Sequence, residues 1–327
     1  MENMDMTNGL TPSRRQFVAG AALACMAASW PAAARARRPF FGRHRDLELG
    51  IQLYPLSAEV ERDLQGSFAK LAKLGFKAIE TAGLHGHTAA ELKAAADANG
   101  LAIRGMHIPV QWHRSPQDHM LTEDVAPIIA DLQTVGAKSV VMALPLLAEG
   151  TVPALDDKLL PKLRSLIGAF TEADWKRTAD FLNRRGEEFR KAGIRLSYHN
   201  HNFEFAPVDG TTGWDILLRE TDPALVGFEM DIGWVAAAGR DPVEVLAQAK
   251  GRVQMLHMKD IDPRTKANFV AEQISVPLGK GIVDWPKLLD LAYASGVHGY
   301  FVEQEPPFAN GPFAALAQSM AYLHVVR

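Results

Sequence analysis

The chain has 327 residues, of which 47% are hydrophobic and 22% are charged, and its formal net charge is -3 at pH 7. This is the composition of an ordinary globular protein, long enough for one large domain or two small ones. The slightly acidic charge offers nucleic acid no basic track, and no stretch beyond the first 36 residues is long and apolar enough to span a bilayer. We therefore expect no nucleic-acid partner and no stable membrane association of the mature chain.

The first 36 residues resemble a twin-arginine export signal. Ser13-Arg14-Arg15-Gln16-Phe17 precedes an apolar run over residues 18–30, and Ala34-Arg35-Ala36 resembles a cleavage site. Removal of residues 1–36 would leave a soluble protein in the periplasm. The only cysteine, Cys25, lies in this leader in a poor context for lipid attachment, so cleavage would leave no thiol and no disulfide.

From residue 48 onward a unit recurs, made of a helical segment, a glycine and a short apolar run. Glycine at the end of a helix, followed by a strand buried on both faces, is typical of parallel α/β architecture. A single-domain TIM (β/α)8 barrel over residues 37–327 is therefore predicted, whereas a dinucleotide-binding domain is disfavoured because no Gly-x-Gly-x-x-Gly follows the first strand. The expected strands are residues 50–53, 77–80, 103–108, 139–144, 195–199, 226–231, 253–257 and 299–303.

Two connections, residues 111–123 and 145–171, are longer than a barrel requires. Loops that follow barrel strands lie on the catalytic face, where long ones often form lids. Thr171 and Asp174 predict a capping box that starts a helix ending near Lys191.

The stretch Leu196–Glu204 concentrates two imidazoles, two amides and a carboxylate at the end of the fifth predicted strand. Alternation along a strand places His199 and His201 on one face, with Tyr198 and Asn200 on the other. Such a cluster requires a polar partner, and a metal ion or a polar substrate would satisfy it. The alternative is a polar strand end held in ordinary hydrogen bonds.

The next three predicted strands also end in side chains that can bind a metal: Asp231, His257 and Glu303. The C-terminal ends of the strands supply the active site of a TIM barrel, so these residues and His199 should lie at one level. Mixed nitrogen and oxygen ligands predict one divalent ion, such as Mn, Zn, Co, Mg or Fe, and the ligand types do not choose among these.

These motifs resemble the sugar isomerase and epimerase superfamily with the xylose isomerase-like TIM barrel. The resemblance spans residues 48 to about 325 and implies that Asp231, His257 and Glu303 are metal ligands. The segments that show this resemblance are Met230–Trp234, Leu256–Asp260, Phe301–Glu303, Tyr198–Phe205 and Leu278–Trp285.

The fourth ligand is where this sequence departs from the family. Ketose epimerases of the family place a glutamate on strand five, where it serves as ligand and as acid/base group. Here His199 occupies that position and is the favoured ligand, with Glu204 as the alternative. A paired-glutamate mechanism therefore loses one partner. Glu303 could still act as one catalytic base, and His201, His107 or Glu204 could act as the other.

Further residues are predicted to contact the substrate. Glu80 and His107 end strands two and three on the catalytic side, where the resemblance implies contacts with substrate hydroxyls; the alternative is a hydrogen bond to a metal ligand. Lys259 could polarise a carbonyl or pair with Asp260 or Glu305, and pairing is the favoured interpretation. Trp234 could pack against a sugar face, and Asn200 is a further candidate for substrate binding.

A divalent ion beside carboxylates and histidines suits removal of a proton α to a carbonyl. We predict a metal-dependent isomerase or epimerase acting on a free or oxidised sugar, because an exported enzyme would not meet phosphorylated metabolites. The first alternative is a dehydratase or lyase that eliminates from a 3-keto-glycoside or related keto-sugar. The second is an exported, non-catalytic sugar-binding barrel. A three-zinc phosphodiesterase is disfavoured by the missing basic track. A homo-oligomer is compatible with the sequence.

Overall fold

The computed structural model describes residues 38–112, 115, 117–154, 159–249 and 251–327. The predicted export signal and Cys25 lie outside these residues, so cleavage and export stay predictions. Within the described ranges, no helix combines the length and the apolar character needed to cross a membrane.

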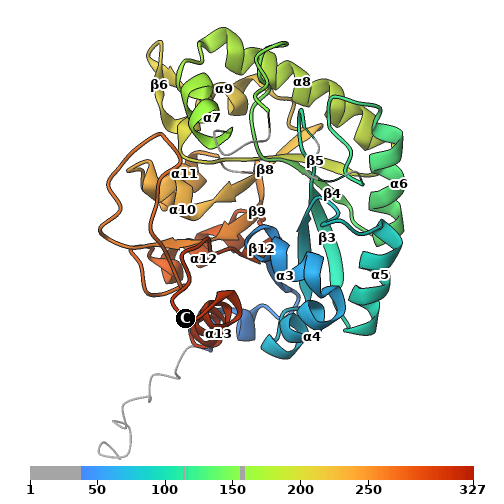
Figure 1. Ribbon diagram of the computed structural model, residues 1–327. Helices are drawn as coiled ribbons and strands as arrows, with labels where there is room; N and C mark the ends of the chain where they lie inside the picture. The colour runs from blue at the N-terminus through green and yellow to red at the C-terminus, as the bar shows by residue number, and fades with distance from the viewer. Residues whose placement is uncertain (1–37, 113–114, 116, 155–158, 250) are drawn as a thin grey trace, which may run out of the picture. The chain divides into compact units, whose positions relative to one another are not determined.

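Eight parallel strands close into a barrel within the unit Pro39–Arg327 (Figure 1). Neighbouring strands follow the chain order, and the last strand pairs with the first through Leu49 and Tyr300, which closes the sheet. The predicted single-domain TIM barrel is confirmed, and each predicted strand matches an observed one within two residues at either end. The strands are β1 (Leu49–Gln52), β2 (Ala78–Ala82), β3 (Ala102–His107), β4 (Ser139–Met142), β5 (Arg195–His199), β8 (Val226–Asp231), β9 (Val253–Met258) and β12 (Gly299–Val302).

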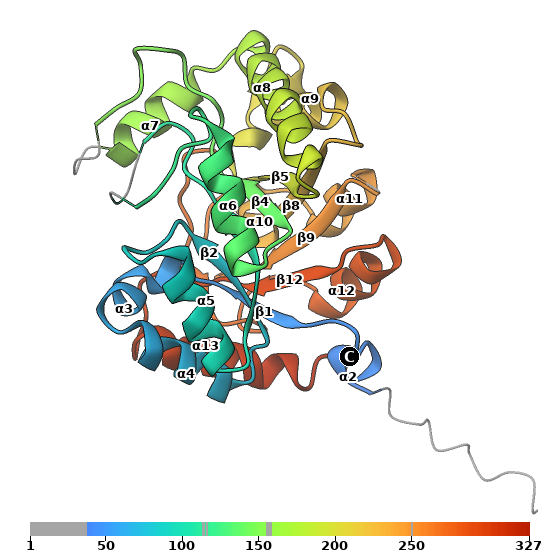
Figure 2. The same ribbon diagram turned by 90° about the vertical axis from the view of Figure 1, so that its right-hand side faces the viewer.

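Helices surround the barrel, as Figure 2 shows from the side of α5 and α6. Two-residue strand pairs, β6 (Pro207–Val208) with β7 (Thr211–Thr212) and β10 (Asp260–Ile261) with β11 (Ser275–Val276), lie outside the barrel sheet. The helices are α2 (Phe40–Arg43), α3 (Ser57–Arg62), α4 (Leu64–Leu74), α5 (Ala89–Ala98), α6 (Val125–Val135), α7 (Leu159–Gly168), α8 (Glu172–Lys191), α9 (Gly213–Glu220), α10 (Ile232–Ala237), α11 (Pro242–Gln248), α12 (Trp285–Ala294) and α13 (Pro312–Leu323).

Local sequence explains how the helices begin and end. The backbone N–H and the hydroxyl of Thr171 each donate to the Asp174 carboxylate at 2.8 Å, so α8 starts where the capping box predicts. Gly75 follows α4 and Gly136 follows α6 with φ of 103° and 81°, a left-handed conformation that favours glycine. These turns confirm the predicted order of helix, glycine and strand.

The long connection 145–171 differs from the prediction because it contains α7. Pro161 is the third residue of this helix, in the first turn, where a missing backbone N–H breaks no helical hydrogen bond. A proline in this connection is therefore consistent with the first turn of a helix as well as with a loop.

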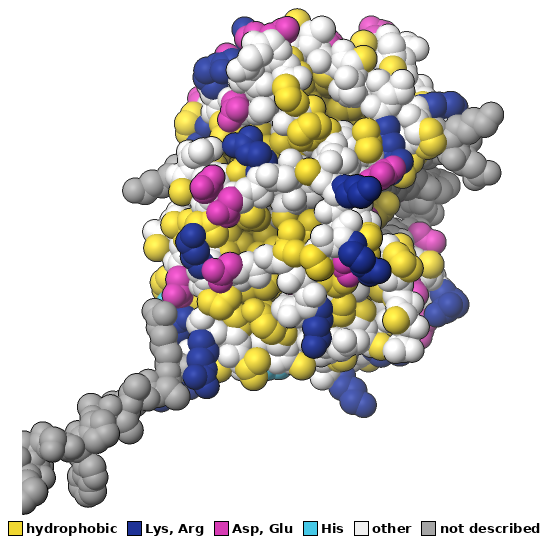
Figure 3. All heavy atoms as spheres, turned by 90° about the vertical axis from the view of Figure 1, so that its left-hand side faces the viewer, with side chains coloured by type: hydrophobic (Ala, Val, Ile, Leu, Met, Phe, Trp, Pro, Cys, Tyr) yellow, Lys and Arg dark blue, Asp and Glu magenta, His cyan; other side chains and the backbone are white. Residues whose placement is uncertain are grey.

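Charged side chains are mixed on the face drawn in Figure 3, where Lys and Arg alternate with Asp and Glu among apolar side chains. On this face the Lys and Arg side chains stand apart from one another and form no continuous basic track.

The buried Asp260 carboxylate holds the loop that leads into α12. Its Oδ2 accepts hydrogen bonds from the backbone of Gly279 at 2.9 Å and Gly281 at 3.2 Å, and from the indole N–H of Trp285 at 2.9 Å. A side chain at Gly281 would collide with this carboxylate, since a Cβ there would lie 2.1 Å from Asp260 Oδ1. The Leu278–Trp285 motif is thus explained by its packing around one acidic residue.

We expect Asp260→Ala to lower the free energy of unfolding by about 3 kcal/mol, because it leaves several buried N–H donors without an acceptor. Chemical denaturation monitored by circular dichroism measures the change. Asp262→Ala is the matched control, since Asp262 pairs with the exposed Arg264 and its loss should change stability little. Equal destabilisation by the two variants would contradict this role of Asp260.

Candidate active site

A layer of buried polar side chains fills the barrel towards the C-terminal ends of its strands. On β8, Glu229 and Asp231 are two residues apart and therefore share the inward face. The buried members of the layer are Glu80 on β2, His199 on β5, Glu229 and Asp231 on β8, His257 on β9, and Glu303 directly after β12. His107 on β3 joins them with its side chain 13% exposed.

The structure brings the four predicted metal ligands together. One donor atom from each of His199, Asp231, His257 and Glu303 lies within 4.8 Å of the others. A second group with the same spacing shares His199 and His257 with the first. It adds His107 and Glu229, so two overlapping sets of donors occupy the same end of the barrel.

Glu229 is absent from the residues predicted from sequence, although it contacts three imidazoles. Its Oε2 lies 2.8 Å from His107 Nε2, 3.1 Å from His199 Nδ1 and 3.0 Å from His257 Nε2. The alternation that places Asp231 inward also places Glu229 inward, so the pattern that could have found it was present. Gln52 is a further unpredicted member, since its amide donates to Glu80 Oε2 at 2.9 Å.

Negative charge exceeds fixed positive charge in this layer. Four carboxylates (Glu80, Glu229, Asp231 and Glu303) face one buried ammonium group, that of Lys259. Lys259 Nζ lies 2.9 Å from Asp231 Oδ2 and 3.2 Å from Glu303 Oε2. Buried charge without compensation costs several kcal/mol per ion. The layer therefore requires further positive charge, either from protonated histidines or from a bound cation.

The histidines respond to this excess of carboxylates in opposite ways. Burial disfavours the His107 imidazolium, but the carboxylates of Glu80 and Glu229 outweigh burial and raise its pKa to about 9. Burial also opposes protonation of His257, yet Glu229 and Glu303 hold its pKa well above 6.5. Burial and the neighbouring His257 lower the pKa of His199 to about 3. Without an ion, protons on His107 and His257 supply two of the three missing positive charges. Burial also raises the pKa of Asp231 to about 7, so its carboxyl group is partly protonated at neutral pH and reduces the remaining excess.

A divalent ion fits this donor set. Imidazole nitrogens and carboxylate oxygens are ligands that Mn, Zn, Co and Fe accept, and they supply the negative charge that a dication balances. Moreover, Glu80 Oε1 and Glu229 Oε1 are buried and have no hydrogen-bond partner. The layer could hold such an ion, and its chemistry does not fix which one.

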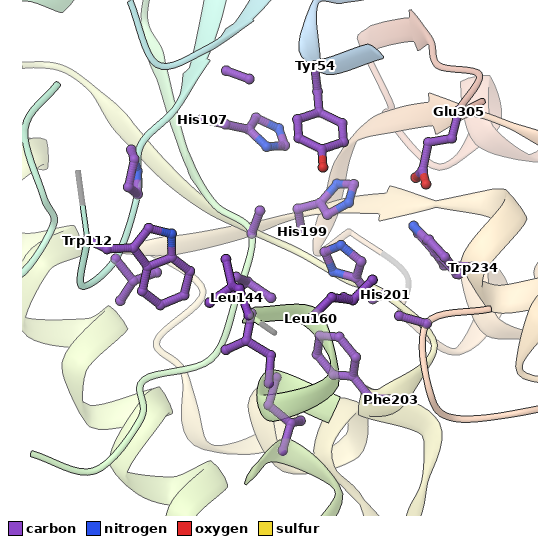
Figure 4. A pocket seen from close by; sticks show the side chains of 18 of the residues that line it. Tyr54, His107, Trp112, Leu144, Leu160, His199, His201, Phe203, Trp234 and Glu305 are labelled. Carbon is purple, nitrogen blue, oxygen red and sulfur yellow. The ribbon is translucent and has the colours of Figure 1, made fainter. Parts of the chain in front are cut away.

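A cavity of about 330 Å³ opens onto this layer (Figure 4). Of the predicted catalytic and substrate-binding residues, His107, His201, Glu303 and Trp234 line it. The His201 ring stacks on Phe203 with the ring centres 5.1 Å apart, and its Nδ1 is buried without a partner. Burial lowers the pKa of His201 well below 6.5, so its imidazole is neutral at neutral pH.

The structure does not bring Glu204 to the cavity or to either donor group. Its Oε1 accepts from the Tyr198 hydroxyl at 2.7 Å and its Oε2 from the His201 backbone N–H at 2.8 Å. Burial raises its pKa to about 8. Side chains alternate along β5, so Tyr198 lies on the face opposite to that of His199. The hydrogen bond to the Tyr198 hydroxyl keeps the Glu204 carboxylate on that side as well. Between the two candidates for the fourth ligand, the geometry favours His199, which belongs to both donor groups.

Three of the predicted substrate-binding residues do not line the cavity. Asn200 is buried and joins two strands, because its Oδ1 accepts from the Asp231 backbone N–H at 3.0 Å. Glu80 is fully buried, with Oε2 2.6 Å from His257 Nε2. Lys259 pairs with Glu305 at 2.8 Å, one of its two predicted partners, and with Asp231 at 2.9 Å, which was not predicted. Asp260, the other predicted partner, instead accepts hydrogen bonds from the loop before α12. The positions of Asn200, Glu80 and Lys259 support the donor atoms of the layer rather than a substrate.

The motif after β8 positions Lys259. Asp231 Oδ1 accepts from the Trp234 backbone N–H at 2.8 Å and so caps α10. Lys259 Nζ then lies 4.9 Å from the centre of the Trp234 ring. At Gly233 an added Cβ would lie 2.6 Å from Lys259 Cγ, so glycine is required for this approach.

We expect Gly233→Ala to displace the Lys259 ammonium from Asp231 and Glu303, and to weaken divalent-ion binding by about 10-fold. Competition with a fluorescent chelator measures the affinity. Gly42→Ala is the control. An added Cβ at Gly42 would have its nearest neighbour 3.8 Å away, and Gly42 lies on α2, which contributes no side chain to the polar layer. Unchanged ion affinity in a folded Gly233→Ala protein would contradict the expected displacement.

Residues 68–324 match the model of the xylose isomerase-like TIM barrel family, and the chain therefore belongs to that family. This places it among TIM barrels that modify sugars. It is 27% identical over 274 residues to the inosose dehydratase of Geobacillus thermodenitrificans, covering 78% of this chain and 87% of that protein.

Two solved structures have the same fold. A sugar phosphate isomerase/epimerase from Parabacteroides distasonis is 25% identical with a TM-score of 0.65, covering 84% of this chain and 97% of that one. A 3-keto-D-glucoside 4-epimerase from E. coli is 16% identical with a TM-score of 0.54, covering 85% of this chain and 98% of the other. At such identities these similarities support the barrel and leave the reaction open.

Proposed function

We propose that the protein is a metal-dependent lyase that removes a proton α to the carbonyl of a keto-sugar or keto-cyclitol and expels a leaving group from the next carbon. The observation that carries this proposal is the convergence of His199, Asp231, His257 and Glu303 next to a cavity that His201 also lines. The relative from Geobacillus thermodenitrificans is named a dehydratase, and its alignment with this chain covers most of both proteins. This favours elimination over the other reactions of the family.

The four convergent residues would hold the ion. When bound, a divalent ion supplies Lewis-acid polarisation of a carbonyl oxygen, which acidifies the neighbouring C–H bond. His201 is suited to take that proton because its ring reaches the cavity and its Nδ1 is not engaged elsewhere. Glu303 also lines the cavity, but although burial opposes its ionisation, Lys259 and His257 hold its pKa well below 4.5, so it is a carboxylate with no proton to give. The proton that His201 has taken would therefore be the one passed to the departing group.

Isomerase or epimerase activity, the first prediction, differs from elimination in the step after proton removal. Epimerisation requires a second acid/base group on the opposite face of the carbon, and in ketose epimerases of the family the strand-five glutamate fills that role. Here that position holds His199, whose Nδ1 contacts Glu229 and which belongs to both donor groups. A histidine engaged in this way is less suited to proton transfer, and elimination needs only one base and one leaving group.

The proposed reaction is tested with the ion-loaded full chain and inosose in deuterated water, followed by mass spectrometry. Elimination predicts a product that has lost one water. Deuterium incorporation without loss of water would instead favour isomerase or epimerase chemistry. Protein stripped with a chelator is the control and should be inactive. An ion-loaded protein that neither removes water from inosose or 3-keto-glucose nor incorporates deuterium into them would contradict the proposal.

We also propose that the enzyme acts in the periplasm on free or oxidised sugars, supported by the twin-arginine-like Ser13-Arg14-Arg15-Gln16-Phe17. N-terminal sequencing of protein recovered from the periplasmic fraction tests this. A mature N-terminus near residue 37 is expected, and an intact N-terminus in the cytoplasmic fraction would contradict it.

A further inference from the structure

The cavity next to the donor atoms has two chemically different halves. Figure 4 shows Trp112 and Leu144 on one side of the pocket, with Glu305 and Trp234 on the other. The polar half is lined by Gln52, His107, His199, His201, Glu303 and Glu305. The apolar half is lined by Trp112, Leu144, Leu159, Leu160, Leu163 and Ile167. A ligand that fills both halves must itself have a polar and an apolar part.

One face of α7 supplies most of the apolar half. Leu159, Leu163 and Ile167 follow each other at intervals of four residues and therefore share one side of the helix. Leu160 also lines the cavity and is 50% exposed. An apolar group that covered these side chains would remove them from water, which is favourable.

Neither a second sugar nor an anion suits this half. Hydroxyls placed against leucine and isoleucine would lose their hydrogen bonds to water without replacement. Among the described residues that line the cavity, Arg164 is the one Lys or Arg. Two of its three guanidinium nitrogens are already engaged, since Nη2 donates to the Ala271 carbonyl at 3.0 Å and Nη1 lies 3.3 Å from Glu272, which leaves Nε as a single donor without a partner. The lining thus provides no clamp for a phosphate.

We infer that the substrate is a keto-sugar joined through its glycosidic oxygen to an uncharged, apolar aglycone, which occupies the half formed by α7 and Trp112. This inference rests on the proposed elimination and names its substrate class and leaving group. The sugar lies beside His201 and Glu303, and the aglycone lies against Leu160 and Leu163. A bare monosaccharide would leave the apolar half unfilled.

The elimination then releases the aglycone. In a 3-keto-glycoside the base takes the proton from C2, and the electron pair of that C–H bond forms the C1=C2 double bond. The bond between C1 and the glycosidic oxygen breaks, and the oxygen gains one proton and leaves as an alcohol. The products are an unsaturated keto-sugar and the free aglycone. No oxidant is consumed, because C3 is already a ketone; a dehydrogenation at C3 must supply this substrate.

Methyl and benzyl 3-keto-glucosides, each as α and β anomers, test the inference. Both release a primary alcohol, so a difference in rate reports the apolar group rather than the chemistry of the leaving group. With the ion-loaded full chain, we expect kcat/KM to be about 10-fold or more higher for the benzyl compound. Mass spectrometry of the unsaturated keto-sugar follows both reactions, and tryptophan fluorescence measures binding independently of turnover.

Two matched variants locate the effect. Leu160→Ser should raise KM for the benzyl compound about 5-fold or more, and by a larger factor than it changes KM for the methyl compound. Ile282→Ser is the control, because Ile282 is 51% exposed and does not line the cavity. Both sites are exposed, so both variants should fold.

The outcomes separate this inference from the function on which it rests. Dehydration of inosose with no preference between the two glucosides would overturn the apolar site and leave the proposed lyase standing. Preferential binding of the benzyl compound without turnover of any compound would overturn the lyase and leave the apolar site standing. Faster reaction of 3-keto-glucose 6-phosphate than of the benzyl glucoside would also overturn the inference.

Discussion

Replacing His257 with alanine should remove both divalent-ion binding and turnover. Both ring nitrogens of His257 contact carboxylates, since Nδ1 lies 2.7 Å from Glu303 Oε2 and Nε2 lies 2.6 Å from Glu80 Oε2. It also belongs to both overlapping donor groups, so the expectation holds wherever the ion binds. Loss of a residue that merely orients a ligand costs 10- to 100-fold in metal affinity, and loss of a ligand should therefore cost more than about 100-fold.

Metal content per chain, measured by mass spectrometry, and activity on inosose check this result. The variant also leaves buried carboxylates without their imidazole partner, which should lower stability. His257→Gln retains a polar group there, and circular dichroism separates loss of the ion from loss of the fold. His298→Ala is the control, because His298 is an exposed histidine outside the layer. A folded His257→Ala protein with full ion content would disprove the site.

The barrel strands could be predicted because buried parallel strands are short apolar runs, and the glycines that end helices mark where these runs begin. The helix α7 was harder to predict because Pro161 and the neighbouring prolines indicate a loop as readily as a first helical turn. The two-residue pairs β6–β7 and β10–β11 are too short to leave an alternating pattern.

The site was predictable strand by strand but not across the barrel. Alternation gives each strand an inward face, which explains why His199 lies among the donor atoms. Tyr198, on the other face, holds the Glu204 carboxylate away from the cavity through its hydroxyl. The same rule includes Glu229 once the whole inward face of β8 is considered, not only its last residue. In contrast, Glu80 meets His257 across 177 positions of sequence, and only closure of the barrel brings them together.

A pair of variants on one strand should reveal which donor group holds the ion. Asp231 belongs to the group with Glu303, and Glu229 belongs to the group with His107. Asp231→Asn and Glu229→Gln each change one carboxylate to an amide of the same shape, two residues apart on β8. In Asp231→Asn the amide oxygen could still accept from the Trp234 N–H and cap α10, so the fold should be preserved in both proteins.

If the ion binds at the predicted quartet, Asp231→Asn should weaken it by more than about 100-fold and Glu229→Gln by about 10-fold, because Glu229 then only orients His199 and His257. Competition with a fluorescent chelator gives both affinities in the same assay. The opposite order would move the ion to the group that contains His107, away from Glu303 and the proposed proton transfer. Elimination would then have to begin closer to His107, which also lines the cavity, and Glu303 would serve chiefly to hold Lys259 and His257.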